Sequence, residues 1–189
     1  MTILIVALGN PGNEYKNTRH NIGWMALEHL PFYRQLAWKE KFKSRYSQYN
    51  HKGEKYIFIE PQTFMNLSGE SVRPAMDFFK IPLEDIIIIH DEIDLPFGTI
   101  QLKKGGGLAG NNGLKSIAQH LGSQGFKRIR MGVGRPKFGD VASHVLGNFN
   151  PDEQISLDDY LKLGCEAIES IIEVGFQKSQ NKFSKRSVI

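Results

Sequence analysis

The sequence predicts a single α/β domain whose mixed, twisted sheet carries helices on both faces. Short runs rich in β-branched residues alternate along the chain with segments of helical periodicity. Ile86–Ile89 is a run of four isoleucines, which is typical of a central strand buried on both faces. A chain of 189 residues can bury one sizeable core and is marginal for two. We therefore expect one domain over residues 1–176, followed by a basic, mobile tail at 177–189.

The N-terminal segment predicts a strand, a turn and a helix. The apolar run Thr2–Leu8 indicates a buried strand, and the turn residues Gly9–Gly12 end it. A helix is expected from Thr18, as its N-cap, to Pro31, because apolar residues recur between them at helical spacing.

A hairpin and a second helix follow. Arg45–Tyr49 and Lys55–Ile59 have strand composition and are separated by a turn at Lys52-Gly53. After a polar loop, Ser71–Phe79 predicts a helix that ends before Pro82.

The C-terminal half contains two more strands and two helices. Strands are expected at Thr99–Leu102 and Arg128–Val133, separated by a glycine-rich loop and a short helix over Leu114–Leu121. Pro151 is expected to open a long helix that ends near Val174.

The composition favours a globular protein without a membrane-spanning segment. Hydrophobic residues make up 40% and charged residues 23% of the chain, which is ordinary for a globular protein. The N-terminal apolar run is too short for a signal peptide, and no apolar run is long enough to span a membrane. The single cysteine excludes an intrachain disulfide and favours a reducing compartment. We expect a cytoplasmic protein with no membrane partner.

Charge is distributed unevenly along the chain. The net charge is +4, and the stretch Leu95–Gly139 contains no Asp or Glu. It contains eight basic residues, namely Lys103, Lys104, Lys115, Lys127, Arg128, Arg130, Arg135 and Lys137. A positive surface of this kind suits a polyanion such as nucleic acid, although chance clustering on a solvated surface is the alternative.

Three polar segments lie where strands are expected to end, the place where open α/β sheets bind ligands. They are Gly9–Asn21, Thr63–Gly69 and His90–Asp94. His20 would lie in the first turn of its helix, where the helix N-terminus disfavours the imidazolium and leaves the neutral ring that a general base needs. Asp91 could accept a hydrogen bond from the other ring nitrogen and orient the base. A locally bonded histidine and a turn-forming aspartate are the alternatives.

The sequence gives little support for a side-chain nucleophile, a cofactor site or a metal site. Ser68 lacks the glycine-flanked elbow of serine hydrolases, and acidic neighbours should raise the pKa of Cys165, so an activated water is the expected attacker. Gly105–Gly110 matches the glycine pattern of dinucleotide-binding sites, but the acidic residue that should follow about 20 positions later is missing. The glycines are better explained by a need for flexibility or for a close backbone approach, for example to phosphate. In His90–Asp94 the side chains alternate, so at most two would converge on a metal. We predict neither a metal nor a cofactor.

Four blocks of the sequence together resemble a known family. They are Val6–Gly12 with Tyr15 and Thr18–Gly23, then Pro61–Gly69, His90–Pro96 and Gly105–Gly113. In this order and at this spacing they closely resemble the bacterial peptidyl-tRNA hydrolases, over at least Ile3 to Arg135. The resemblance implies a monomeric, metal-independent enzyme that hydrolyses the ester between a peptide and the 3′-terminal ribose of tRNA, which recycles tRNA from aborted translation.

The resemblance also implies roles for individual residues. His20 matches the catalytic base, Asp91 the carboxylate that holds it, and Asn10 an amide at the reacting ester. The residues expected to bind the substrate are Tyr15, Phe64, Asn66 and Asn112. Those expected to contact tRNA phosphates are Lys103, Lys104 and Arg130. The chain departs from the family pattern at Asn111, where a histidine is usual, so a group that cannot titrate near neutral pH stands there.

A non-enzymatic RNA-binding relative, such as a chloroplast splicing factor, is the main alternative. Such a protein would not need His20, Asp91 and the three amides together, so their joint presence favours the enzyme.

Overall fold

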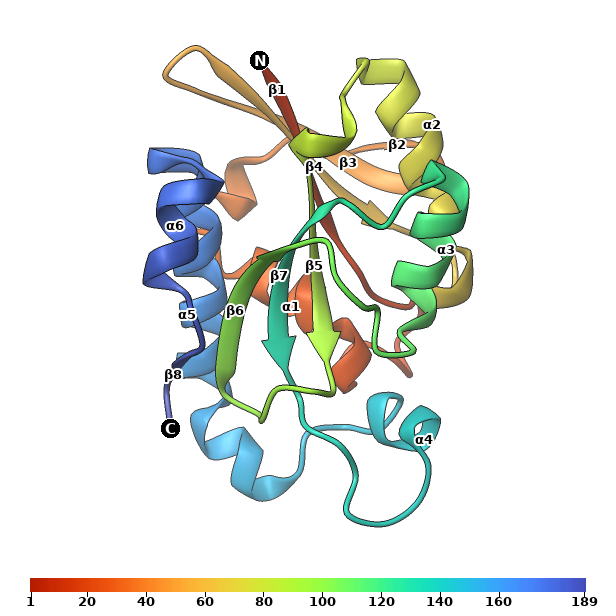
Figure 1. Cartoon of the computed structure of the whole chain (residues 1–189), viewed down its shortest axis with the longest axis vertical. Coiled ribbons are helices and arrows are strands. Elements are labelled where there is room, and N and C mark those ends of the chain that lie inside the picture. Colours follow the sequence, from red (N-terminus) through yellow and green to blue (C-terminus); the bar gives the residue numbers. More distant parts are fainter.

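The computed structural model describes residues 1–189 and arranges them around one eight-stranded sheet (Figure 1). The order of strands across the sheet is β2-β3-β4-β1-β5-β7-β6-β8. The strands are β1 (Thr2–Ala7), β2 (Lys39–Lys41), β3 (Ser44–His51), β4 (Glu54–Pro61), β5 (Ile86–Glu92), β6 (Thr99–Lys104), β7 (Lys127–Gly132) and β8 (Arg186–Ser187).

The sheet is parallel at its centre and antiparallel at both sides. β1 pairs in parallel with β4 and with β5, and β5 pairs in parallel with β7. The predicted hairpin, formed by β3 and β4, adds an antiparallel side, and β6 adds the other. All seven residues of β5 are buried, as expected for the strand that contains Ile86–Ile89. The mixed sheet is therefore confirmed.

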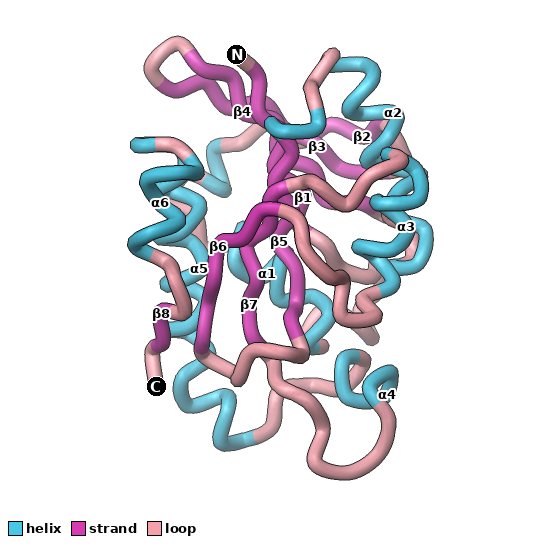
Figure 2. The backbone as a smooth tube through the Cα atoms, in the orientation of Figure 1, coloured by secondary structure: helices cyan, strands magenta, loops and turns pink.

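Helices cover both faces of the sheet (Figure 2). They are α1 (Ile22–Glu28), α2 (Gly69–Phe79), α3 (Asn112–Leu121), α4 (Val141–Val145), α5 (Pro151–Val174) and α6 (Phe176–Lys182), with short 3₁₀ turns η1 (Arg19–Asn21), η2 (Tyr33–Gln35), η3 (Met65–Leu67) and η4 (Leu83–Asp85). Apolar residues of α1, α5 and α6 belong to the larger core cluster, whereas α2 and α3 contribute to a smaller cluster on the opposite face. None of the helices has the length and apolar character needed to cross a membrane.

The long helix α5 has the bounds predicted from the sequence. Asn150 accepts a hydrogen bond from the backbone N–H of Glu153, whose side chain accepts one from the backbone N–H of Asn150. This capping box and Pro151 in the first turn satisfy or remove the N–H groups that a helix start leaves free. Local chemistry thus accounts for where this helix begins.

The helix predicted from Thr18 is divided into η1 and α1. Thr18 precedes η1, but its hydroxyl donates to the carbonyl of Tyr15 instead of capping the helix. At the end of η1, the buried Asn21 binds the backbone of Asn10 through its side-chain amide. These contacts with the preceding loop hold residues 19–21 in a tighter turn, and the α-helix begins after them.

Residues 177–189 differ from the expected mobile tail. The chain continues through α6, and β8 pairs antiparallel with β6. Phe183 is 2% exposed in the larger core, and its carbonyl accepts a hydrogen bond from the backbone N–H of Leu102. The polar composition of this segment hid Phe183, which is buried in the larger core together with Phe176 just before the segment and so anchors it. The short elements β2 and α4 were also not predicted, because three and five residues are too few to carry a periodic pattern.

Candidate active site

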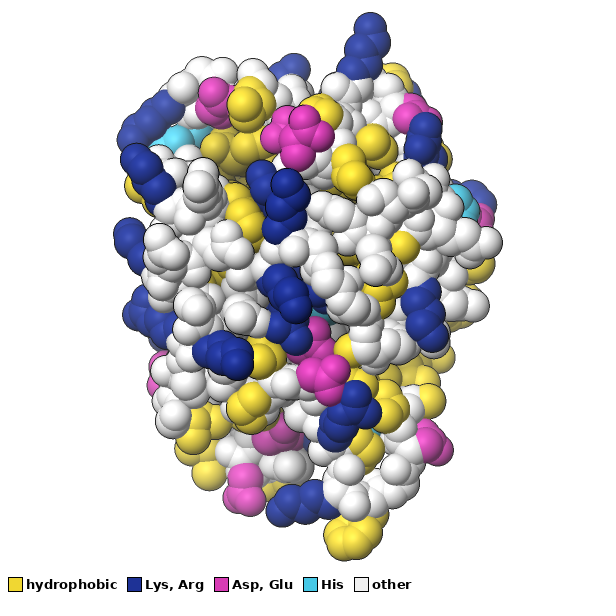
Figure 3. Space-filling view, in the orientation of Figure 1, with side chains coloured by type: hydrophobic (Ala, Val, Ile, Leu, Met, Phe, Trp, Pro, Cys, Tyr) yellow, Lys and Arg dark blue, Asp and Glu magenta, His cyan; other side chains and the backbone are white.

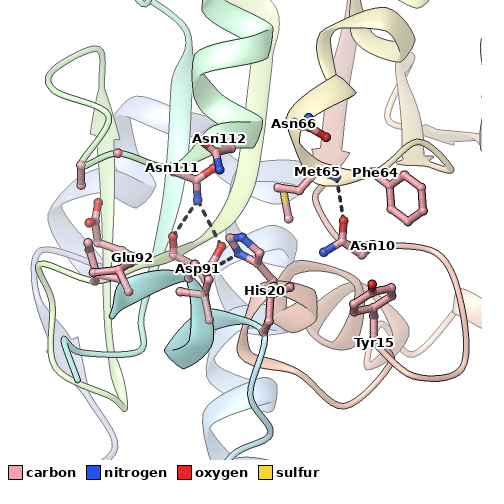
Figure 4. A pocket seen from close by; sticks show the side chains of 17 residues that line it. Asn10, Tyr15, His20, Phe64, Met65, Asn66, Asp91, Glu92, Asn111 and Asn112 are labelled. Atoms are coloured by element: carbon pink, nitrogen blue, oxygen red, sulfur yellow. Dashed lines mark hydrogen bonds and ion pairs between the residues drawn. The ribbon is translucent and has the colours of Figure 1, made fainter. Parts of the chain in front are cut away.

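A cavity of about 440 Å³ opens at the carboxyl ends of β1 and β5 (Figure 4). Its walls come from the loop after β1, from η1, from the segment around η3, from the end of β5, from the glycine-rich loop before α3, and from α4. All seven residues that were predicted to act on or bind the substrate line it, namely Asn10, Tyr15, His20, Phe64, Asn66, Asp91 and Asn112. Four distant segments of the chain therefore meet at one place.

His20 and Asp91 form a closely bonded, buried pair in this cavity. The distance between Nδ1 of His20 and Oδ2 of Asp91 is 2.7 Å, and the two side chains are 9% and 1% exposed. Because the carboxylate can only accept, it binds the tautomer of the ring with a proton on Nδ1. In the neutral ring, the lone pair then lies on Nε2.

The protonation of His20 is set by different groups from those predicted. Burial has the largest effect on the pKa of His20 and lowers it, but the charge of Asp91 and the hydrogen bond to it both raise that pKa. The pKa therefore lies above its ordinary value of 6.5. The prediction that a helix N-terminus favours the neutral ring was wrong, because His20 lies in a three-residue turn and faces a buried carboxylate.

Asp91 lies within β5, whereas the sequence placed it just beyond the strand. Its Oδ2 atom faces His20, and its Oδ1 atom accepts a hydrogen bond of 3.2 Å from Nδ2 of Asn111. The Oδ1 atom of Asn111 accepts a hydrogen bond from the backbone N–H of Leu114 and so caps α3. The one residue that departs from the family pattern is thus bonded directly to the carboxylate.

Asn10 is held by contacts that sequence reasoning missed. Asn21 accepts a hydrogen bond from the backbone N–H of Asn10 and donates one to its carbonyl, at 2.8 and 3.0 Å. The side-chain Oδ1 of Asn10 accepts a hydrogen bond of 2.7 Å from the backbone N–H of Met65. Its Nδ2 then remains on the side that faces His20 (Figure 4). Asn21 lies within a block that resembles the family, but nothing in the residue pattern indicated its partner.

The outer part of the cavity is mainly apolar. Tyr15 and Phe64 meet edge to face, with 6.5 Å between ring centroids, and Phe64 is 56% exposed. Asn66 and Asn112 are exposed at the rim. Another wall comes from α4 and the residue that follows it, which contribute Val141, Ala142, Val145 and Leu146. The sequence feature that could have predicted this helix is Asp140, which caps α4 and is followed by apolar residues four positions apart.

The three basic residues expected to contact tRNA do not line the cavity, and they differ in accessibility. Lys104 is exposed and Lys103 is half-buried. Arg130 is only 12% exposed, and its Nε atom lies 2.8 Å from Oε1 of Glu92. Lys and Arg side chains run along the middle of the face that carries β6 (Figure 3). Lys103 and Lys104 therefore offer their charge more freely than Arg130 does.

The glycine-rich loop makes a close approach within the protein. Gly106 has φ of +89°, and a Cβ atom there would lie 2.8 Å from Cε of Lys103. The neighbouring Gly105 carbonyl accepts a hydrogen bond from the fully buried Arg128. Glycine is favoured at position 106 because a φ of +89° is one that L side chains rarely adopt.

No side-chain nucleophile lies beside His20. Ser68 is fully buried, and its hydroxyl donates to the carbonyl of Met65. Burial, followed by the hydrogen bond to Glu169, raises the pKa of Cys165 far above its ordinary range, as predicted. A water activated by His20 remains the expected attacker.

Comparison with known proteins agrees with this arrangement. Residues 4–188 match the family model described as peptidyl-tRNA hydrolase. The chain is 46% identical over 187 residues to a peptidyl-tRNA hydrolase of Geotalea daltonii, covering 98% of each chain, and 45% identical over 184 residues to one of Listeria monocytogenes, covering 97% of this chain and 99% of the relative. The crystal structure of peptidyl-tRNA hydrolase from Acinetobacter baumannii is 35% identical, covers 98% of this chain and 96% of its own, and superposes with a TM-score of 0.89. With its fold, its site and its relatives in agreement, this chain belongs to the peptidyl-tRNA hydrolase family.

Proposed function

We propose that this protein hydrolyses the ester that joins the carboxyl end of a peptide to the 3′-terminal ribose of tRNA, with His20 as the general base. The observation that carries this proposal is the hydrogen-bonded pair of His20 and Asp91 in a cavity that is also lined by four asparagine side chains. Membership of the family supplies the substrate class. The alternative of a non-enzymatic RNA-binding protein is not favoured, because the relatives are named as hydrolases and this chain matches nearly the whole length of each.

The reaction starts with a water beside Nε2 of His20. As the water oxygen attacks the ester carbonyl carbon, Nε2 takes its proton, and the imidazolium is stabilised by the carboxylate of Asp91. Such general-base assistance contributes roughly 10²–10⁴-fold to the rate. When the tetrahedral intermediate collapses, the bond to the ribose oxygen breaks, and that oxygen takes the proton back from His20. The base is then restored.

The tetrahedral intermediate carries a negative oxygen that needs a hydrogen-bond donor. Asn10 is suited to this role because the backbone N–H of Met65 binds its Oδ1 and leaves Nδ2 free to donate. Asn21 holds the backbone of Asn10 on both sides. A positioned donor of this kind contributes on the order of 3 kcal/mol to the transition state.

Selection of peptidyl-tRNA over aminoacyl-tRNA is assigned to Asn66 and Asn112. Their amides can both donate to and accept from a peptide group, whereas a free α-ammonium only donates. A site built to form such hydrogen bonds rejects a ligand that leaves them unpaired. The apolar wall from α4 and the ring of Phe64 are then available to side chains of the peptide.

The tRNA phosphates are assigned to Lys103 and Lys104, with a smaller contribution from Arg130, whose guanidinium is already paired with Glu92. Phosphate contacts of this kind fix position without reading sequence. We further propose a monomer in the cytoplasm. A cavity built from one chain and a single buried free cysteine support this.

The proposal is tested by release of an N-blocked amino acid from tRNA. The purified protein is incubated with N-acetyl-aminoacyl-tRNA in the presence of EDTA, and with unblocked aminoacyl-tRNA as the matched substrate. We expect rapid release from the first and little from the second. Binding of the blocked tRNA without release would contradict the proposal and support the RNA-binding alternative.

A further inference from the structure

We propose that Asn111 is a positioning residue for the base, because its amide holds the carboxylate that holds His20. This inference rests on the function proposed above for the same cavity. Asn111 does not need to touch the substrate for this role. It acts through Asp91, and it does so by a contact that is separate from its role as the cap of α3.

The amide of Asn111 is fixed at both ends. Its Oδ1 accepts a hydrogen bond of 3.1 Å from the backbone N–H of Leu114. Its Nδ2 lies 3.2 Å from Oδ1 of Asp91 and 3.3 Å from the carbonyl oxygen of the same residue. Because Leu114 offers a donor and Asp91 offers only acceptors, the amide can satisfy both in one orientation alone. The first turn of α3 and the end of β5 are thereby joined.

The carboxylate of Asp91 is shared between two partners. Oδ2 binds His20 and Oδ1 binds Asn111, and no other side chain donates to this carboxylate. A donor on Oδ1 prevents the carboxylate from rotating, so Oδ2 stays in line with Nδ1 of His20. The same donor stabilises negative charge on Asp91 and so weakens its pull on the proton of the imidazole.

Other charged groups around the pair are already engaged. Glu92 also borders the cavity, but its carboxylate is paired with Arg130. Arg19 lies next to His20, but its guanidinium binds Glu153 and the carbonyl of His144. On β5, His90 bonds the carbonyl of Asp91, and burial, reinforced by the charge of Arg128, lowers the pKa of His90 to about 4.

The other walls add few charges to the pair. From the loop after β1, the only titratable group that lines the cavity is the hydroxyl of Tyr15. The segment around η3 and the wall of α4 contribute only amide and apolar side chains to the cavity. On the glycine-rich loop the cavity is lined by Ala109, Gly110, Asn111 and Asn112. Among the charged groups, Asp91 therefore has the main effect on the charge state of His20, and Asn111 is the other side chain that bonds to its carboxylate.

The two roles of Asn111 can be separated by substitution. Serine is a good N-cap and can replace the acceptor for Leu114, but its shorter side chain no longer donates to Asp91. Alanine removes both contacts. A role limited to capping predicts that Asn111→Ser behaves as the wild type and Asn111→Ala does not. A positioning role predicts that both variants change the base in the same way.

The direct measurement is the NMR titration of the His20 ring, assigned by its absence in His20→Ala. We expect the titration midpoint of His20 to rise by about 0.5–1 unit in both Asn111→Ser and Asn111→Ala, as for loss of one hydrogen bond to a charged group. The acid limb of kcat/KM should move by the same amount, and kcat at pH 7 should fall about 3–10-fold with little change in KM. Thermal melting confirms that each variant is folded, and Asn50→Ser, on the exposed part of β3, is the matched control.

The outcomes distinguish this inference from the proposed function. An unchanged His20 titration in Asn111→Ser overturns the positioning role and leaves Asn111 as a cap, whether or not the ester is cleaved. A shifted titration, in a protein whose wild type does not cleave N-acetyl-aminoacyl-tRNA, supports the contact with Asp91 and overturns the proposed function instead.

Discussion

His20 and Asp91 are 71 positions apart in the sequence, yet Nδ1 of the first lies 2.7 Å from Oδ2 of the second. The parallel pairing of β1 with β5 brings them together. The register sets Ala7 opposite Ile89, so the loop after β1 and the last residues of β5 reach the same edge of the sheet. In an open α/β sheet this edge is where ligands bind, and here it is where four polar segments form one cavity.

Removal of the imidazole is expected to abolish most turnover. In His20→Ala no group at the cavity replaces the base, so kcat should fall by roughly 10²–10⁴-fold. Binding of a tRNA mimic, followed by fluorescence anisotropy, should stay within about twofold, since the residues proposed to contact phosphate do not line this cavity. His29→Ala, at a histidine that pairs with Asp158 outside the cavity, serves as the control. Full activity of His20→Ala would remove this residue from the mechanism.

Neutralising Asp91 is expected to shift the pH profile in a defined direction. The charge of Asp91 and its hydrogen bond raise the pKa of His20 against the lowering effect of burial. In Asp91→Asn only the lowering effect remains, so the acid limb of kcat/KM should move to lower pH. At the same time kcat at pH 7 should fall, because an asparagine can present its N–H to the ring and stabilise the wrong tautomer. A pH–rate profile measures both effects, and an acid limb that moves to higher pH would contradict the assignment.

Salt is expected to weaken substrate binding more than it slows the chemistry. Contacts with tRNA phosphates release counterions, so KM should rise steeply with salt while kcat changes little. Replacing Lys103 or Lys104 with Gln should reduce the slope of log KM against log salt by about 1 for each phosphate that is no longer neutralised. Lys162→Gln, on the acidic helix α5, should leave that slope unchanged. A KM that is flat from low to high salt would exclude the phosphate contacts.

A buried carboxyl that does not line the cavity is expected to make stability fall as pH rises. Burial raises the pKa of Glu60 to about 7, although the charge of Arg45 opposes this rise. Between the ordinary pKa of 4.5 and this value, the folded state binds a proton that the unfolded state has lost, so the free energy of unfolding falls as pH rises through that range. Glu60→Gln removes this titration. At pH 8 the variant should be more stable than the wild type by roughly 1–3 kcal/mol.

A second measurement at low pH serves as the control for Glu60→Gln. Below pH 4.5 the wild-type side chain is also neutral, so the stability difference between variant and wild type should shrink there. Urea unfolding at pH 4 and pH 8 measures both differences. If the stability difference between Glu60→Gln and the wild type instead grows as pH falls, then Glu60 is stabilised as the carboxylate, through Arg45, and this prediction is overturned.

Elements with a strong local pattern were predicted from the sequence. Ile86–Ile89 formed the buried first half of β5, and α5 began and ended where Pro151 and the following periodicity indicated. The candidate site residues could also be predicted, because motifs in a characteristic order indicated the family and the family implied which residues to consider. In each case the information lies in residues close together in the chain, where it acts through backbone geometry, capping and the alternation of buried faces.

The tertiary structure alone decided which partner each side chain has. It determined that Asp91 outweighs burial in setting the pKa of His20, that Arg130 is paired with Glu92, and that Phe183 fixes the C-terminal segment to the sheet. It also placed the amide of Asn111 on the carboxylate of Asp91. Such contacts join residues far apart in the chain, and the strength of each depends on how completely the surrounding residues exclude water. The family of this protein could therefore be recognised from its sequence, whereas the charge and orientation of His20 depend on packing that no local pattern encodes.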